Sequence, residues 1–198
     1  EGGLFSMGGE GAGVFIPAVM VEQDLGILMS QALEAGDSLV VQFQQPAQRN
    51  FDGGPKMIGV TPADSTRLYI LEANGNVFGG FYRSEDAGES FLKLNQGGKN
   101  FFGYSTAGAD DRGQAPRDMA IAVSPYDADE VHIAGINSWY SRNGGVSFLP
   151  TSDWVPSAAF SQNIGYCHAD VDDMFFVDSV LYAVTDGGIF LAEASNEV

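Results

Sequence analysis

Basic residues are scarce in this sequence. Nine lysines and arginines stand against 26 aspartates and glutamates, which gives a formal net charge of −17. A nucleic-acid-binding surface needs clusters of lysine and arginine, and none is present, so nucleic acid is a poor partner. Anionic membrane surfaces are disfavoured for the same reason. The acidity instead indicates that negative charge keeps the protein soluble, or that the protein works in a salt-rich habitat or in a medium that contains calcium.

Cysteine and long apolar runs are equally rare. Cys167 is the single cysteine, which excludes an internal disulfide framework. No apolar run approaches the roughly 18 residues that a membrane-spanning helix requires. The region from Gly2 to Phe15 lacks the basic start of a signal peptide, so we expect mature or internal sequence if the protein is exported. Only Asp24 to Leu33 has a weak helical pattern.

Glycine is abundant, and the most informative glycines belong to a repeated eight-residue pattern. The pattern is Ser-x-Asp/Asn-x-Gly-x-Ser-Phe, and its two copies begin 57 residues apart. Asp or Asn in a tight turn accepts hydrogen bonds from backbone N–H groups further along the turn, while glycine supplies a positive φ. We therefore predict two stapled β-hairpins whose phenylalanines return to the hydrophobic layer. Their defining residues are Ser84, Asp86, Gly88, Ser90 and Phe91, then Ser141, Asn143, Gly145, Ser147 and Phe148.

Each hairpin ends a longer repeat of about 50 to 57 residues, close to the length of a propeller blade. A repeat reads as an inner strand, a second strand, an aromatic third strand, the stapled turn and a short fourth strand. The predicted inner strands are 56–62, 118–125 and 172–178, the second strands 67–71, 130–135 and 180–184, and the third strands 80–84, 138–141 and 188–192. Residues 26–39 form a degenerate copy.

This organisation predicts an all-β fold made of four-stranded antiparallel β-propeller blades. Residues 1–198 would form about three and a half blades, with approximate units 1–50, 51–110, 111–160 and 161–198 and no second domain. Propellers have about four to eight blades, so we expect this chain to be part of a larger propeller. The remaining blades would come from the same polypeptide or from another chain.

The Ser-x-Asp-x-Gly-x-Ser-Phe pattern resembles the Asp-box, or BNR repeat, of sialidases, sortilin-type (VPS10) propellers and xyloglucanase-like glycoside hydrolases. Gly-Phe-Tyr-Arg-Ser before the first copy, and His168-Ala169-Asp170 ahead of Thr185–Phe190, are most similar to secreted sortilin-type propellers of Bacteroidetes, many of which are type IX secretion cargo. The resemblance covers about residues 56 to 192. It implies a secreted or cell-surface propeller, and the box itself is specific for fold rather than for function.

The densest group of chemically capable residues is His168, Asp170, Asp172 and Asp173, at the entry to a predicted inner strand. These side chains are candidate binding residues, because an inner strand borders the central channel of a propeller. Asp170, Asp172 and Asp173 could bind Ca²⁺, although their spacing lacks the alternating ligands of a dedicated calcium loop. The structural alternative is that Asp170 and Asp172 cap turns while His168 packs against Tyr166. No other cofactor is expected.

Asp186 is a further candidate, in a Thr-Asp-Gly-Gly segment. Xyloglucanase-like hydrolases place a catalytic carboxylate in a similar segment, so the resemblance implies a possible acid–base pair of Asp186 with Asp170 or Asp172. Two function classes follow. The favoured one is a non-catalytic extracellular propeller that binds a protein or glycan, and the alternative is a glycoside hydrolase that cleaves a polysaccharide. Photosystem assembly factors share such blades, but their basic surface patch is absent here.

Overall fold

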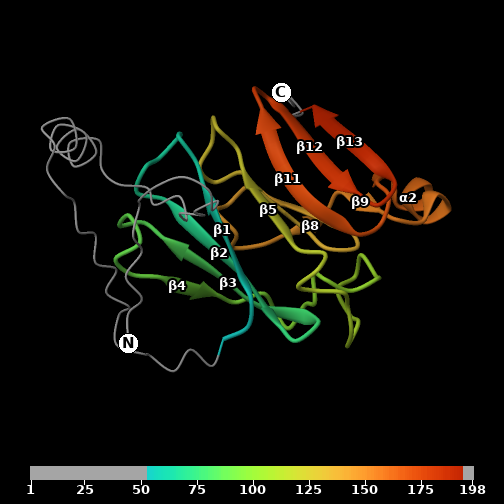
Figure 1. The fold of residues 1–198 in the computed structure, drawn as a ribbon, viewed down its shortest axis with the longest axis horizontal. Helices are drawn as coiled ribbons and strands as arrows, with labels where there is room; N and C mark the ends of the chain where they lie inside the picture. Colours follow the sequence, from blue (N-terminus) through green and yellow to red (C-terminus); the bar gives the residue numbers. More distant parts are fainter. Residues whose placement is uncertain (1–52, 194–198) are drawn as a thin grey trace, which may run out of the picture. The chain divides into compact units, whose positions relative to one another are not determined.

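The structure is a computed structural model that describes residues 53–193. Three antiparallel sheets follow one another along the chain, each a simple meander of neighbouring strands (Figure 1). Sheet 1 contains β1 (Lys56–Val60), β2 (Leu68–Asn74), β3 (Val77–Ser84) and β4 (Leu92–Leu94). Sheet 2 contains β5 (Ala120–Val123), β6 (Val131–Ala134), β7 (Ser138–Ser141) and β8 (Leu149–Pro150). Sheet 3 contains β11 (Val171–Val177), β12 (Val180–Thr185) and β13 (Gly188–Glu193).

The first strands of the three sheets lie side by side, with β5 between β1 and β11 (Figure 1). All four residues of β5 are therefore buried, with Ile121 and Val123 facing sheet 1 and Ala120 and Ala122 facing sheet 3. Gly59 allows β1 to approach, because a Cβ there would come within 2.9 Å of the Ile121 and Val123 side chains. Successive meanders that meet along their first strands are β-propeller blades, so the predicted all-β fold class is confirmed.

The predicted strands of the three described repeats overlap the observed ones in sheets 1, 2 and 3. The degenerate copy at residues 26–39, the weak helical pattern and the predicted unit 1–50 lie outside the described residues. Besides the two short strands that flank it, the seven-residue helix α2 (Pro156–Gln162) was not predicted; it begins with proline and ends at Asn163 in the left-handed conformation. It lies between β9 (Ser152–Asp153) and β10 (Gly165–Tyr166), which pair in parallel.

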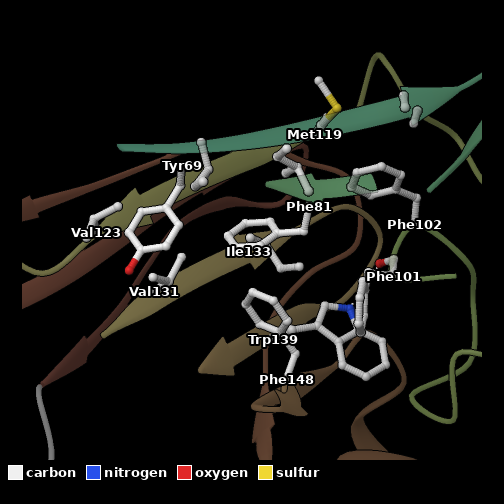
Figure 2. Packing of buried hydrophobic residues seen from close by; sticks show 14 residues of the cluster. Tyr69, Phe81, Phe101, Phe102, Met119, Val123, Val131, Ile133, Trp139 and Phe148 are labelled. Carbon is white, nitrogen blue, oxygen red and sulfur yellow. Dashed lines mark hydrogen bonds between the residues drawn. The ribbon is translucent and has the colours of Figure 1, made fainter. Parts of the chain in front are cut away.

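The main core fills the space between sheets 1 and 2, which we call the first wedge. Its rings meet mostly edge to face: Phe101 lies 5.0 Å from Trp139 and 5.3 Å from Phe148, and Phe148 lies 5.1 Å from Phe81. Figure 2 shows Phe101, Trp139 and Phe148 gathered at one end of this core. All four rings are at most 2% exposed, so the first wedge is packed solid.

Polar contacts at the edge of the first wedge also join sheets 1 and 2. The Arg67 guanidinium donates to Asp129 at 2.6 Å, and the Tyr69 hydroxyl donates to the carbonyl of Ala128 at 2.7 Å. Arg83 donates to the carbonyl of Gly144 in the second repeat hairpin. The two sheets are therefore linked by hydrophobic packing inside and by directional bonds at the rim.

Both repeat hairpins have the predicted stapling hydrogen bonds, but only Phe148 returns to the hydrophobic layer as predicted, whereas Phe91 is 38% exposed. In the second hairpin Ser141 Oγ accepts from the N–H groups of Asn143 and Gly145 and donates to Asn143 Oδ1, which in turn accepts from the N–H of Ser147. The first hairpin repeats these bonds with Ser84, Asp86, Gly88 and Ser90. The hydrogen bonds from Ser90 and Ser84 hold the pKa of the Asp86 carboxyl at about 2. Side chains thus replace the backbone partners that a tight turn cannot supply.

We expect Ser141→Ala to lower the free energy of unfolding by about 1–2 kcal/mol, because the buried N–H of Gly145 then loses its acceptor. Chemical denaturation measures the change. Ser161→Ala on α2 is the control and should change stability by less than about 0.5 kcal/mol, since its hydroxyl bonds only within an exposed helical turn. Equal effects of the two substitutions would contradict a stapling role for the hairpin serine.

Candidate functional site

The candidate site lies where the first strands of sheets 2 and 3 begin. Arg117 stands just before β5, and its guanidinium reaches carboxylates of both sheets. We call Arg117, Asp118, Asp170, Asp172 and Asp186 the Arg117 cluster. Three of its carboxylates, Asp170, Asp172 and Asp186, are among the candidates from the sequence, so the structure gathers these three around Arg117 and Asp118 but not Asp173.

Arg117 is the shared cation of the cluster. Its Nη2 lies 3.2 Å from Asp186 Oδ1 and 3.9 Å from Asp172 Oδ1, and its Nη1 lies 3.4 Å from Asp118 Oδ1. The side chains of Arg117, Asp172 and Asp186 are 60%, 43% and 46% exposed, so water screens these pairs and each contributes little by itself. The cluster therefore links sheet 2 to sheet 3 because Arg117 lies between carboxylates of both sheets and compensates their negative charges.

Asp118 is the buried member of the cluster. Its side chain has no exposed surface, and among the described residues its Oδ2 has no hydrogen-bond partner. Burial and then the negative charge of Asp170 raise the pKa of the Asp118 carboxyl to about 6, although Arg117 opposes the shift. A proton on Asp118 would let this carboxyl donate a hydrogen bond to Asp170. Asp118 Oδ1 already accepts from Arg117, so both oxygens of the buried carboxyl would then have partners. The Asp118 carboxyl thus keeps its proton to a higher pH than an ordinary aspartate does.

Asp170 is positioned by its backbone and by a loop of sheet 2. It adopts a positive φ of 64°, which aspartate tolerates better than most residues, and its Oδ1 accepts from Gln114 Nε2 at 2.8 Å. The next residue, Val171, donates its N–H to the carbonyl of Gly135 and so attaches β11 to sheet 2. A bulge between Val171 and Asp173 then directs Asp172 toward Arg117.

Asp186 is presented by the turn between β12 and β13. Thr185 Oγ1 accepts from the N–H of Gly187 and donates to the carbonyl of Gly188, which closes the turn. Glycine is needed at 187 because a Cβ there would lie 2.2 Å from Cγ of His168. His168 therefore packs beneath the turn that carries Asp186. The ring of Tyr166, the partner suggested for His168 from the sequence, packs instead edge to face with Phe190 at 5.7 Å.

Asp173 stands apart from the Arg117 cluster. Its Oδ1 accepts the N–H of Met174 at 2.8 Å, and its side chain is exposed on the outer face of sheet 3. Among residues 53–193 no three His, Cys, Asp or Glu side chains lie close enough together to hold a metal ion. Asp170, Asp172 and Asp173, suggested for Ca²⁺, are therefore not gathered as a ligand set.

Sequence reasoning missed Arg117, Asp118 and Gln114. The repeat contained a usable signal, since Asp118-Met119 and Asp173-Met174 both stand at the start of an inner strand. Alignment of the two repeats therefore matched Asp118 with Asp173, a member of the acidic group that the sequence had singled out. Arg117 had no such signal, because its role depends on the approach of a turn that lies 69 residues further along the chain.

Two cavities lie away from the Arg117 cluster. One of ≈ 460 Å³ is bounded by β3, β4 and the loop that follows, including Phe78, Lys93 and Lys99. The other, of ≈ 270 Å³, lies between sheets 2 and 3, in the space that we call the second wedge. Asp170, Asp172 and Asp186 line neither cavity. Cys167 lines the second one, and burial raises the pKa of its thiol to about 11, so it stays protonated near neutral pH.

No helix within residues 53–193 is both long enough and apolar enough to span a membrane. Neither a protein-family model nor a curated protein sequence matches the chain. The propeller fold is evident from the chain's own sheet order and strand register.

Solved structures of three β-propeller proteins are similar to the chain. An ancestral GH74 enzyme is 16% identical, with 67% of this chain and 14% of that protein covered and a TM-score of 0.43. The GH74 enzyme of Niastella koreensis is 16% identical, with 71% and 21% covered and a TM-score of 0.45. YCF48 bound to a D1 peptide is 11% identical, with 74% and 41% covered and a TM-score of 0.43. The chain therefore spans less than half the length of each of these similar proteins.

Proposed function

We propose that this protein is a non-catalytic β-propeller module that binds a protein or glycan partner. The observation that carries the proposal is the sharing of one guanidinium, that of Arg117, by Asp118, Asp172 and Asp186. These carboxylates compensate a cation and join two sheets, which is a structural task. They also line neither of the two cavities described above.

Exposed apolar surface supports a role in association. Phe175, Val177, Ile189 and Leu191 on the outer face of sheet 3 are 42–68% exposed, and Ile58 and Val60 on the outer face of β1 are 61–65% exposed. Contiguous apolar surface of this kind is typical of interfaces. We include further blades, from the same polypeptide or another chain, among the proposed partners of these faces.

The proposed location is outside the cell or on its surface. The supporting observations are the resemblance of the two hairpins to Asp-boxes of sortilin-type propellers, including type IX secretion cargo, and the strongly acidic composition. The stapled bonds of both hairpins suit that resemblance, because the box residues that define it are the ones that hydrogen-bond.

One observation favours a second candidate, a xyloglucanase-like glycoside hydrolase. Asp172 and Asp186 both approach the same nitrogen of Arg117, at 3.9 and 3.2 Å, so their carboxylates are near neighbours. Glycosidases use two carboxylates that lie about 5–9.5 Å apart. In that reading Asp186 and Asp172, or Asp170, would serve as the acid–base pair.

Hydrolysis of polysaccharides separates the two candidates. We expect the protein to release no reducing sugar from xyloglucan and related β-glucans, because its acidic residues are paired with Arg117. Asp186→Asn should leave that baseline unchanged and lower stability only slightly, since the Arg117 pair is exposed. Reducing-end assays with long incubation measure the first result and thermal denaturation measures the second.

The control is Asp173→Asn, which removes a carboxylate of β11 that belongs to the same sheet but lies outside the Arg117 cluster. Hydrolysis by the parent protein that disappears in Asp186→Asn and persists in Asp173→Asn would overturn the non-catalytic proposal and establish the hydrolase.

A further inference from the structure

The larger of the two cavities lies where β4 separates from β3. Strand β3 has eight residues and β4 has three, and the two pair only between Phe81–Arg83 and Leu92–Leu94. Beyond Leu94 the chain leaves the sheet as a loop, residues 95–99, while the first half of β3 has no partner in β4. The ≈ 460 Å³ space between them is lined by both Lys93 and Lys99, and we call it the lysine cavity.

The loop that bounds the lysine cavity is held at several points. The Gln96 side chain donates to the carbonyl of Gly145 at 2.7 Å, and the N–H of Lys99 donates to the carbonyl of Gln96, which closes a turn. The buried side chain of Asn100 then accepts the N–H of Phe78 and returns the chain to β3. The wall is therefore built before a ligand arrives, which lowers the entropy cost of binding.

The two lysines of the cavity differ from most basic residues of the protein. The basic residues that pair with carboxylates are Lys56, Arg67, Arg83 and Arg117. Within residues 53–193 neither Lys93 nor Lys99 has a carboxylate partner, and none of the described residues that line the cavity is acidic. In a chain with 26 acidic residues this is a local positive site, which attracts an anionic group.

Both ammonium groups can donate to a ligand without giving up a carboxylate. Lys93 Nζ donates to the carbonyl of Gly79 at 3.1 Å and lies 5.3 Å from the ring centroid of Tyr82, so its position is fixed. An ammonium has three donors, and two of them remain. The Lys99 side chain packs on Gly108, where a Cβ would come within 3.2 Å of it.

The rest of the cavity wall suits a sugar. Phe78 is half-buried, and its ring is held edge to face by Phe101 at 4.9 Å. The amide side chains of Asn95 and Gln96 also line the cavity. A pyranose ring has apolar C–H faces that pack on an aromatic ring, and its hydroxyls pair with amides. A few polar groups beside an apolar surface are typical of small-ligand sites.

An extended peptide suits the cavity less well. Such a peptide gains affinity by adding to a strand edge, which requires free backbone groups. In the part of β3 without a β4 partner, the N–H of Phe78 is already bonded to Asn100 and the carbonyl of Gly79 to Lys93. The side-chain composition of the cavity, rather than strand pairing, therefore selects the ligand.

We propose that the lysine cavity binds a carboxylate-bearing saccharide unit, with Lys93 and Lys99 on its carboxylate, Asn95 and Gln96 on its hydroxyls and Phe78 against its ring. The net charge of −17 repels a dense polyanion, so the favoured ligand is a mostly neutral glycan with isolated acidic units. The inference rests on the proposed binding role and names the glycan class.

The probe is a trisaccharide of two xylose units and one glucuronate, and its control is the same trisaccharide with the carboxylate reduced to an alcohol. In NMR titrations of the full chain, we expect the reduced sugar to bind at least about tenfold more weakly. Lys93→Gln and Lys99→Gln should each weaken binding of the acidic sugar by about threefold to tenfold, since both side chains are exposed and water screens their charges.

Arg112→Gln is the matched control, because it removes an exposed cation that contacts the Tyr104 ring and does not line the cavity. It should change the affinity by less than about twofold. Equal effects of Arg112→Gln and the lysine variants would mean that only overall charge matters and would overturn the proposal.

Two further results would overturn it. One is equal affinity for the acidic and reduced sugars, or no binding of either. The other is a short peptide with a single glutamate that binds as tightly as the acidic sugar and loses affinity in the same lysine variants, which would assign the cavity to an acidic peptide. None of these results changes the outcome of the polysaccharide assay, so failure of this inference is distinct from failure of the proposed function.

Discussion

Phe148→Ala is expected to lower the free energy of unfolding by about 3–5 kcal/mol. Phe148 is 2% exposed and lies between Phe81 of sheet 1 and Phe101 of the loop that joins the sheets. Alanine would leave a cavity at the centre of the first wedge, and the surrounding rings belong to a rigid, fully buried group that cannot close it. Urea or guanidinium denaturation measures the loss.

Phe91→Ala is the matched control for this prediction. Phe91 holds the same position in the first repeat hairpin as Phe148 in the second, but it is 38% exposed. We expect its replacement to cost about 1 kcal/mol or less. Similar losses from the two substitutions would mean that the hairpin motif, rather than the filling of the first wedge, determines the stability contribution of this phenylalanine.

Asp118→Asn is expected to make the protein more stable at pH 7.5, by about 1–3 kcal/mol, with a smaller gain at pH 4.5. The reason is the buried Asp118 carboxyl, whose pKa is raised from 3.8 to about 6 by burial and by the facing charge of Asp170. At neutral pH the folded protein must ionise this carboxyl against those effects. Asparagine carries no charge and can still donate a hydrogen bond to Asp170.

The direction of this pH dependence of stability follows from the difference in proton binding between the folded and unfolded states. Between about pH 4 and pH 6 the folded state holds a proton on Asp118 that the unfolded state has released. Stability from this group is therefore fully present below about pH 4 and is lost as the pH rises through about 6. The groups that face Asp118 are Asp170, Asp172 and Arg117, and the first two oppose its ionisation while Arg117 favours it.

Denaturation midpoints of the parent and Asp118→Asn at pH 4.5, 6 and 7.5 test this prediction. Asp173→Asn serves as the comparison, because that carboxylate lies outside the Arg117 cluster and its removal leaves the groups that face Asp118 in place. A difference between Asp118→Asn and the parent that is constant from pH 4.5 to 7.5 would exclude the raised pKa as its cause.

Much of the fold could be predicted because its determinants are local. The two stapled hairpins follow from residue types within eight positions, and the strands follow from short apolar runs between polar turns. Helix α2 could not be predicted in the same way, since its seven residues carry no amphipathic period. The different burial of Phe91 and Phe148 was also hidden, because identical motifs meet different neighbours on other sheets.

The candidate site could be predicted only in part. Asp170, Asp172 and Asp186 were found because acidic residues recur at the start of an inner strand and in an Asp-Gly-Gly turn. Their arrangement around one guanidinium could not be foreseen, because nothing in the sequence distinguishes Arg117 from the other arginines. The raised pKa of Asp118 likewise arises from tertiary burial, which no spacing of residues encodes.

The order of the sheets has a consequence for folding. Sheets 1, 2 and 3 each contact their neighbours in the sequence, so cooperativity passes along the chain from one sheet to the next as in other repeat proteins. The packed first wedge couples sheets 1 and 2 strongly, while the hollow second wedge couples sheet 3 more weakly. Local opening should therefore begin at sheet 3 and leave the other two sheets folded, so hydrogen exchange should be faster in the strands of sheet 3 than in β5 and β6.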